Sequence, residues 1–121
     1  MEKPVAGDVV IIPFPQTDLA PGKRRPALAL VNLKGEDVIL CQITSKARFD
    51  GYSISLVSQD FAAGGLPLDS FARPNRLFTI SQSVVLRSVG RIKQEKLDEV
   101  LAATAALFRT AAKKGNAYEA H

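Results

Sequence analysis

The sequence predicts a β-rich α+β fold, in which a small, curled antiparallel sheet or half-open barrel is followed by one C-terminal α-helix. Three observations predict this class. Short apolar runs alternate with turns that contain Gly, Pro and Asn over most of the chain. The apolar period then changes to that of an amphipathic helix. A chain of 121 residues has room for one modest core, so we expect a single domain over residues 1–121.

The predicted strands are apolar segments bounded by turn residues. They are Val9–Phe14, Pro26–Leu33, Val38–Ser45, Ser53–Val57, Asp69–Phe71, Leu77–Ile80 and Val84–Val89. Residues 62–67 contain two adjacent glycines and are expected to form a flexible turn. Gly90 is expected to end the last strand, and residues 73–75 to separate the fifth strand from the sixth. The segment Pro26–Leu33 is apolar on both faces, so it requires cover on both sides.

The C-terminal segment Gln94–Lys113 is predicted to be one amphipathic helix. Its apolar residues recur at spacings of three and four, with acidic residues near its start and basic residues near its end. Gly115 is expected to end it, and the tail 116–121 to fray. Apolar residues from Leu97 to Phe108 are expected to pack in a core or a dimer contact.

The charge is concentrated in the middle of the chain. The formal net charge is +4, and the segment Lys23–Arg91 alone carries +5. This distribution suits a polyanionic partner such as RNA, or an acidic protein tail. The N-terminus lacks a secretory signal pattern, no apolar run is long enough to span a membrane, and there is a single cysteine. We therefore expect a soluble, cytoplasmic protein.

The residues usual in catalytic centres are scarce. The only histidine is the last residue, His121, and the only cysteine, Cys41, falls on an apolar strand face where a buried core thiol is expected. No cluster of His and Cys predicts a transition-metal site, and no glycine-rich phosphate loop is present. We expect neither a metal nor a cofactor.

A cationic turn, Lys23-Arg24-Arg25-Pro26, stands directly before the second strand. Pro26 fixes its own backbone and favours extended geometry at Arg25, so this guanidinium is preorganised as a phosphate site requires. The alternative is that the three cations form a solvated loop. The turn at 34–37 and the third strand bring Thr44 back towards Arg25. The alternative for Thr44 is an ordinary β-branched strand residue.

RNA cleavage is a reaction that arginine and hydroxyl side chains can promote. The substrate supplies its own nucleophile, the ribose 2′-hydroxyl, and requires mainly positioning and stabilisation of a phosphorane-like anion. Arg25 would supply the stabilising charge, and Thr44 would donate or relay a hydrogen bond to a non-bridging oxygen.

Four motifs in order resemble the MazF/PemK family of toxins. They are Gly7-Asp8-Val9-Val10, Lys23-Arg24-Arg25-Pro26-Ala27-Leu28-Ala29-Leu30, Gln42-Ile43-Thr44-Ser45 and Arg73-Pro74-Asn75-Arg76-Leu77-Phe78-Thr79. The resemblance implies an SH3-like barrel with a C-terminal helix, a homodimer and a cognate antitoxin. It also implies a metal-independent endoribonuclease for single-stranded mRNA that leaves 2′,3′-cyclic phosphate and 5′-hydroxyl ends. The family's catalytic Arg and Thr fall on Arg25 and Thr44.

Further side chains are candidates for binding RNA, each with a structural alternative. Lys23 and Arg24 are candidate phosphate contacts, and the remaining candidates are polar, cationic or aromatic side chains near the same strand ends. These are Gln42, Ser45, Lys46, Arg48, Phe49, Arg73 and Arg76. The loops 16–24 and 58–68 depart from the family pattern, which leaves the recognised bases open.

Two other functions compete with the nuclease. One is a non-catalytic toxin of the same barrel class that inhibits a protein target, as CcdB-like gyrase inhibitors do, with the last helical turns carrying the function. The other is an RNA-binding module that cleaves nothing, and whose affinity depends on salt.

Overall fold

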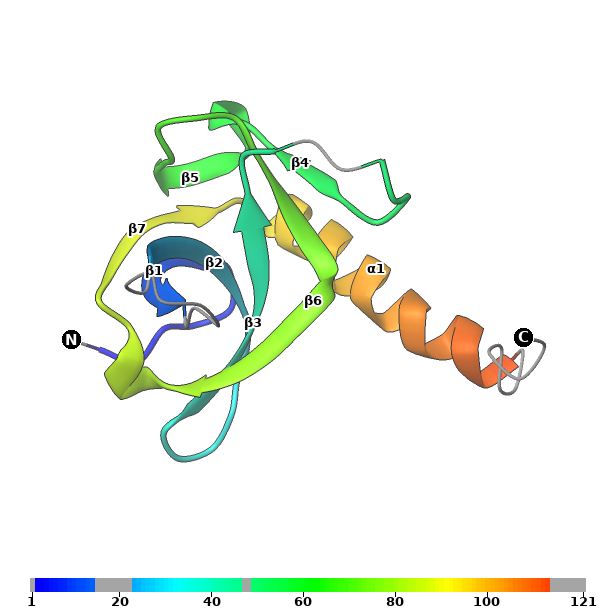
Figure 1. The fold of residues 1–121 in the computed structure, drawn as a ribbon, viewed down its shortest axis with the longest axis horizontal. Helices are drawn as coiled ribbons and strands as arrows, with labels where there is room; N and C mark the ends of the chain where they lie inside the picture. The colour runs from blue at the N-terminus through cyan, green and yellow to red at the C-terminus, as the bar shows by residue number, and fades with distance from the viewer. Residues whose placement is uncertain (1, 15–22, 47–48, 114–121) are drawn as a thin grey trace.

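The computed structural model describes residues 2–14, 23–46 and 49–113. Within these residues seven strands form one antiparallel sheet in the order β4-β6-β3-β2-β1-β7-β5. The strands are β1 (Asp8–Phe14), β2 (Lys23–Asn32), β3 (Asp37–Thr44), β4 (Ile54–Leu56), β5 (Phe61–Gly64), β6 (Ser70–Ser81) and β7 (Arg87–Ile92). Two short 3₁₀ helices, η1 (Ser58–Asp60) and η2 (Gln82–Val84), precede β5 and β7. The sheet curls into a half-barrel (Figure 1), which confirms the predicted fold class.

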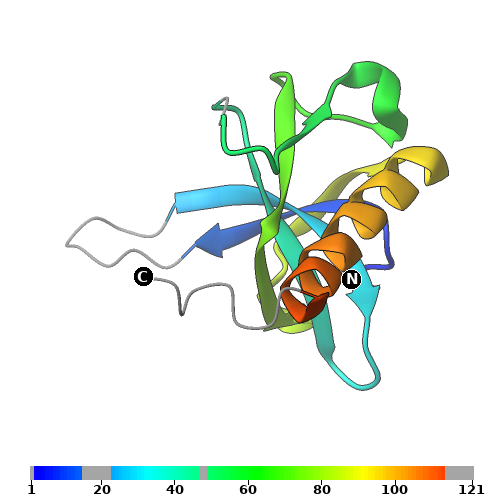
Figure 2. The same cartoon turned by 90° about the vertical axis from the view of Figure 1, so that its right-hand side faces the viewer.

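The helix α1 (Gln94–Lys113) follows the sheet and has the predicted bounds. Its first turns pack on the sheet through Leu97 and Val100, which are buried. Farther along, Phe108 is exposed over 64% of its surface. The C-terminal half extends away from the sheet (Figures 1 and 2), so the helix is anchored at its start. The predicted core packing is therefore confirmed for Leu97 and Val100, whereas at Phe108 the alternative, a dimer contact, stays a prediction. Gly115 and the tail 116–121 lie outside the described residues.

Strand β2 is covered on both faces, as its sequence requires. Leu28 and Leu30 belong to one core cluster, which includes Leu97 and Val100 of the helix. On the opposite face, Ala27 and Ala29 belong to a second cluster with residues of β1 and β3. Alternating side chains thus serve two cores, because successive residues of a strand point to opposite faces. The central strand is consequently held rigidly up to the point where its cationic end begins.

Strand β6 is continuous, which corrects the prediction of two separate strands. Residues 74–76 form a bulge instead of a turn: Cys41 pairs with Leu77 while Gln42 pairs with Arg73. A bulge leaves its extra residues outside the ladder, so Pro74 fits there although it has no N–H to donate. The bulge places Asn75 and Arg76 beside Cys41 and Gln42 of β3.

The predictions for residues 62–67 and for the last strand were wrong. Residues 61–64 form β5, which pairs with β7, and β7 begins at Arg87 and continues past Gly90 to Ile92. Gly64 has φ +62°, and a Cβ built on it would lie 2.1 Å from the carbonyl oxygen of Val89. The glycines permit two backbones to approach closely, a role that sequence alone does not distinguish from a flexible turn.

Among the described residues, no helix has both the length and the apolar content needed to cross a membrane.

Candidate active site

The β2–β3 hairpin places Arg25 and Thr44 at the same end of the sheet. The ladder between β2 and β3 runs from Asn32–Val38 to Ala27–Gln42. Both strands continue two residues beyond that last pair, and the same register brings Arg25 opposite Thr44. Arg25 also pairs with Ile12 of β1, so it is held within a strand rather than in a free loop.

Arg25 and Thr44 line one cavity of about 290 Å³. Arg24, Ser45 and Pro26 also line it, so four of the predicted site residues are brought together. Arg25 and Thr44 are half-buried, whereas Arg24 and Ser45 are exposed. A guanidinium and a hydroxyl at the rim of one cavity can bind the oxygens of a phosphate group.

The hydroxyl of Thr44 is oriented by the turn that follows β3. The backbone N–H of Lys46 donates to Thr44 Oγ1, with an N···O distance of 3.1 Å. Because the oxygen already accepts this hydrogen bond, its own hydrogen is left to donate elsewhere. The hydroxyl hydrogen of Thr44 is available to donate to an anionic oxygen.

A second cavity, of about 520 Å³, lies along the neighbouring part of the same strands. Gln42, Asn75 and Arg76 contribute its polar lining, and Ile12 and Phe78 are among its apolar walls. Gln42 and Thr44 are two residues apart on β3 and share a face, which separates them by about 7 Å along the strand. Neighbouring residues of β1 and β3 therefore line the two cavities, Ile12 and Gln42 the larger one and Ile11 and Ile43 the smaller one.

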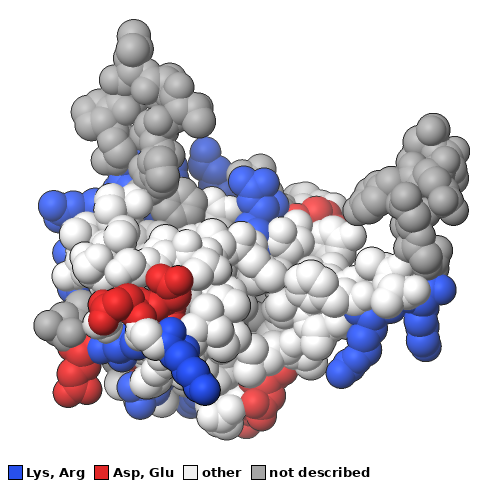
Figure 3. Space-filling view, turned by 90° about the horizontal axis from the view of Figure 1, so that it is seen from below, with Lys and Arg blue, Asp and Glu red and all other residues white. Residues whose placement is uncertain are grey.

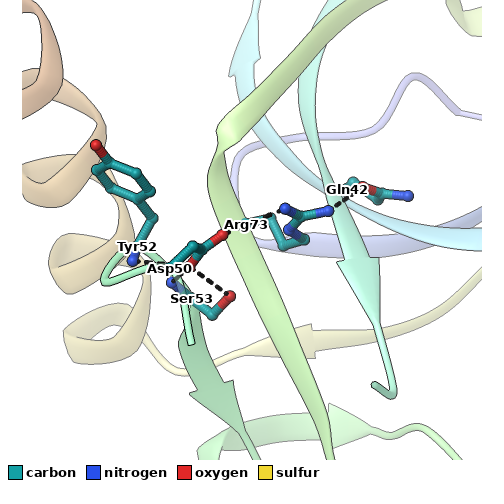
Figure 4. Close-up of polar contacts among 5 residues, drawn as sticks. All are labelled: Gln42, Asp50, Tyr52, Ser53 and Arg73. Carbon is teal, nitrogen blue, oxygen red and sulfur yellow. Dashed lines mark hydrogen bonds and ion pairs between the residues drawn. The ribbon is translucent and has the colours of Figure 1, made fainter. Parts of the chain in front are cut away.

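Arg73 is held between Gln42 and Asp50 (Figure 4). Its Nη1 donates to Gln42 Oε1 at 3.2 Å, and its Nη2 lies 3.3 Å from Asp50 Oδ2. Asp50 also accepts from the backbone N–H groups of Tyr52 and Ser53. The Tyr52 hydrogen bond, together with Arg73, lowers the pKa of Asp50 below its usual value of 3.8. The predicted RNA contact Arg73 is therefore ion-paired and mostly buried.

Other predicted contacts do not line either cavity. Lys23, Lys46 and Phe49 are exposed, and Phe49 is fully so. Arg48 lies outside the described residues. Figure 3 shows the molecule from below: the middle of this face is largely uncharged, and Lys and Arg side chains lie towards its edges. The positive charge predicted from the sequence is therefore not spread over this face.

The structure adds residues that sequence reasoning missed. Arg87 lines the smaller cavity beside Arg24 and Arg25, because Ile11 of β1 pairs with Pro26 on one side and with Arg87 on the other. Ser70 and the segment 65–68 complete that cavity. The only sequence signal for Arg87 was its membership of the cationic middle segment.

Cys41 is a buried core thiol, as predicted. It is fully buried within the first core cluster, and burial raises the pKa of its thiol to about 12. A thiol with so high a pKa is not a nucleophile at neutral pH. Among the described residues, no group of three or more His, Cys, Asp or Glu side chains is arranged to hold a metal ion.

The family model for the PemK-like, MazF-like toxin of type II toxin-antitoxin systems matches residues 6–108. The chain belongs to this family. The match covers both cavities of this PemK-like toxin and every candidate site residue. No curated protein sequence matches the chain closely enough to count as a relative.

Solved structures with the same fold are distant in sequence. A MazE–MazF crystal structure from Deinococcus radiodurans (Form-III) has a TM-score of 0.71 at 23% identity, covering 89% of this PemK-like toxin and 98% of that chain. An endoribonuclease from a mycobacterial species has a TM-score of 0.67 at 18% identity, covering 90% and 94%. The Mycobacterium tuberculosis toxin MazF-mt6 has a TM-score of 0.66 at 20% identity, covering 84% and 96%. At these identities the likeness establishes the fold.

Proposed function

We propose that this toxin is a metal-independent endoribonuclease that cleaves single-stranded mRNA, leaving 2′,3′-cyclic phosphate and 5′-hydroxyl ends. The observation that supports it most is that Arg25 and Thr44, at the same end of neighbouring strands, line one cavity. The family match supports the same activity, because the chain is a MazF-like toxin and a mycobacterial protein of the same fold is described as an endoribonuclease.

The proposed reaction is an internal transfer of the phosphoryl group. The ribose 2′-oxygen loses its proton and attacks the adjacent phosphorus, and the bond from phosphorus to the 5′-oxygen of the next nucleotide breaks. The departing 5′-oxygen gains a proton and leaves as a hydroxyl, while the 2′ and 3′ oxygens share the cyclic phosphate. No water or second nucleophile is consumed in this step.

Arg25 stabilises the negative charge that builds up on the phosphorus oxygens in the transition state. A guanidinium is always protonated and presents a planar set of donors that matches a phosphate. Because Arg25 lies within β2 and pairs with Ile12 of β1, little rearrangement is required when the charge develops. Thr44 donates its hydroxyl hydrogen to a non-bridging oxygen, in the orientation imposed by the Lys46 N–H.

Binding the rest of the RNA is assigned to the cations around the site. Arg24 and Arg87 line the same cavity as Arg25, and exposed Lys23 and Lys46 lie next to it in sequence. Such side chains contact phosphates without reading the bases, so they contribute affinity that falls as salt rises. Arg48 and Phe49 remain predicted contacts of the neighbouring loop.

The partners proposed are a second copy of this chain and a cognate antitoxin. Two proteins of the same fold are described as a MazE–MazF complex and as an endoribonuclease with its cognate antitoxin. An acidic or amphipathic antitoxin segment that covered the cavity of Arg25 would compete with RNA for the same cations. A cytoplasmic location is proposed, since mRNA is the substrate.

Cleavage of single-stranded RNA in EDTA tests the proposal. Purified wild-type protein is expected to cleave and to leave cyclic phosphate ends, and Arg25→Ala is expected to lower the rate by about 10²- to 10³-fold, as loss of one oxyanion donor does. Lys34→Gln serves as the control, because it removes a charge from the exposed turn at the far end of the same hairpin. Cleavage that survives Arg25→Ala, or that stops on chelation, would reject the mechanism.

The protein-poisoning alternative predicts a different result in cells. Growth arrest would then persist in Arg25→Ala and be lost when the last turns of α1, around Phe108, are changed. The family match supports the nuclease over this alternative.

A further inference from the structure

Three apolar residues form one wall of the smaller cavity. Leu66, Pro67 and Leu68 line the cavity that also contains Arg25 and Thr44. Leu66 packs against the first core cluster, whereas Pro67 and Leu68 are exposed, and Leu68 is exposed over 64% of its surface. An exposed leucine is ordinary by itself. Here it continues an apolar surface that starts at the core and reaches the cavity of the proposed catalytic residues, and we call these three residues the apolar wall.

The apolar wall is held in place at both of its ends. Before it, the backbone N–H of Gly65 donates to the carbonyl oxygen of Val89 in β7 at 3.1 Å. Gly64 lies so close to the same strand that a Cβ built on it would be 2.1 Å from that oxygen. After the wall, Ser70 Oγ donates to the carbonyl oxygen of Leu68 at 2.9 Å, and Ser70 is only 4% exposed. The wall is therefore ordered before a ligand binds, which lowers the entropic cost of binding.

The same cavity concentrates positive charge. Arg24, Arg25 and Arg87 line it, and no Asp or Glu is among its described lining residues. Arg87 is two residues from Val89 on β7, the strand to which the wall is bound. Guanidinium groups pair with phosphate oxygens. A cavity of about 290 Å³ lies at the lower end of the roughly 300–1,000 Å³ of ligand sites, so it has room for a phosphate and one nucleoside rather than for a longer segment.

An anion alone does not account for the apolar wall. A phosphate bound by the arginines would leave the wall exposed to water. In RNA each phosphate carries a nucleoside on either side, and the flat face of a nucleobase is its most apolar surface. The side chains of the wall have no donors or acceptors, and the carbonyl oxygen of Leu68 already accepts from Ser70. The wall therefore suits the face of a base and not its hydrogen-bonding edge.

We propose that Leu66, Pro67 and Leu68 bind the base of a nucleotide that flanks the cleaved phosphate. The proposal rests on the proposed function, because it assumes that this phosphate is bound at Arg25. Contact with the face of a base contributes affinity for every base, and contributes more for purines, whose faces are larger. The wall belongs to the loop 58–68, whose role the sequence left open, and the proposal assigns that loop to substrate binding.

Binding of nucleic acid that cannot be cleaved tests the apolar wall separately from catalysis. The probes are a 2′-fluoro oligoadenylate and an abasic 2′-deoxy oligonucleotide of the same length and charge, both of which lack the 2′-hydroxyl nucleophile. Wild type is expected to bind the adenylate probe more tightly. Leu68→Ala should lower the affinity for that probe about 3- to 10-fold, the effect of roughly 30–50 Å² less buried apolar surface, and leave the affinity for the abasic probe unchanged.

Control variants separate the apolar wall from general effects on folding. Leu86→Ala makes the same change at an exposed leucine that lines neither cavity, so it should bind both probes as wild type does. Leu68→Met keeps an apolar side chain of similar size and should also bind as wild type does. Leu68→Asn, similar in size but polar, should resemble Leu68→Ala. Melting temperatures check that each variant is folded.

The outcomes distinguish this inference from the proposed function. A protein that binds the adenylate probe through Leu68 but cleaves no RNA would support the apolar wall and reject the nuclease. A protein that cleaves RNA, and whose Leu68→Ala variant binds both probes as wild type does, would reject the wall alone. Equal weakening of both probes by Leu68→Ala would also reject it, because the effect would not depend on a base. If Leu68→Ala changed only the oligomeric state, the wall would face a second copy of the chain and the proposal would be wrong.

Discussion

The backbone N–H of Lys46 donates to the hydroxyl oxygen of Thr44 at 3.1 Å, at the point where β3 ends. A threonine in a regular strand has no such neighbour, and its hydroxyl rotates freely. Here the oxygen accepts a hydrogen bond from the turn, and the hydroxyl hydrogen remains available to donate to another partner. This contact distinguishes Thr44 from an ordinary strand residue.

Thr44→Val is therefore expected to lower the cleavage rate by about 10²-fold, because it removes one donor to the transition state and keeps the branched shape. Thr44→Ser should retain most of the activity. Single-turnover cleavage of a labelled RNA gives both rates, and thermal unfolding checks that the valine variant is folded. Equal rates for the valine and serine variants would mean that the hydroxyl takes no part.

Arg87 is expected to bind phosphate, since it lines the cavity of Arg25 from β7. Arg87→Gln should weaken RNA binding and reduce the slope of log affinity against log salt by about 0.7, the value for one contact with a single strand. Arg109→Gln removes the same charge from the exposed end of α1 and should leave the slope unchanged. If the Arg87→Gln variant had an unchanged slope, the guanidinium of Arg87 would not contact bound RNA in the wild type.

Asp50 is expected to make folding stability depend on acidity. The Tyr52 hydrogen bond and Arg73 lower its pKa from 3.8, so its carboxylate stabilises the folded state above that pH, and the contribution is lost as the pH falls through the folded pKa. Urea unfolding of wild type and Asp50→Asn should differ near neutral pH and converge in strong acid. A difference that widens on acidification would contradict this assignment.

Gly64→Ala is expected to destabilise the protein by about 3–5 kcal/mol, because the new Cβ meets the Val89 carbonyl oxygen and the φ of +62° disfavours a side chain. Gly51→Ala is the matched control: its φ is +80°, but no atom lies within 4 Å of its Cβ position, so only about 1–2 kcal/mol should be lost. Denaturant unfolding measures both. Equal losses of unfolding free energy in the two variants would show that β5 and β7 can move apart to accommodate the new Cβ without a loss of stability.

Much of the fold follows from local sequence. Apolar segments bounded by turn residues identified β1 to β4 to within a few residues, and the change of apolar period identified α1 with its bounds. Cys41 was correctly assigned to the core, since it lies on the apolar face of its strand. Arg25 was identified as a candidate phosphate-binding residue because Pro26 follows it. Each of these features depends on a short stretch of neighbouring residues, so it can be predicted from the sequence alone.

The remaining features depend on pairing between distant segments. Gly64 belongs to a strand, and not to a flexible turn, because β5 pairs with β7. The bulge at residues 74–76 allows β6 to continue although it contains Pro74. Arg87 reaches the cavity of Arg25 because both strands flank β1.

The sequence by itself determined the fold class, the helix and the cationic end of β2 with Arg25. Only the tertiary structure decided that Asp50 pairs with Arg73, that Arg73 donates to Gln42, and that Gln42 and Asn75 line the same cavity. The physical reason is that a hydrogen bond is set by distance and angle in space. Residues 23 and 31 positions apart in the chain become neighbours only when the sheet has formed.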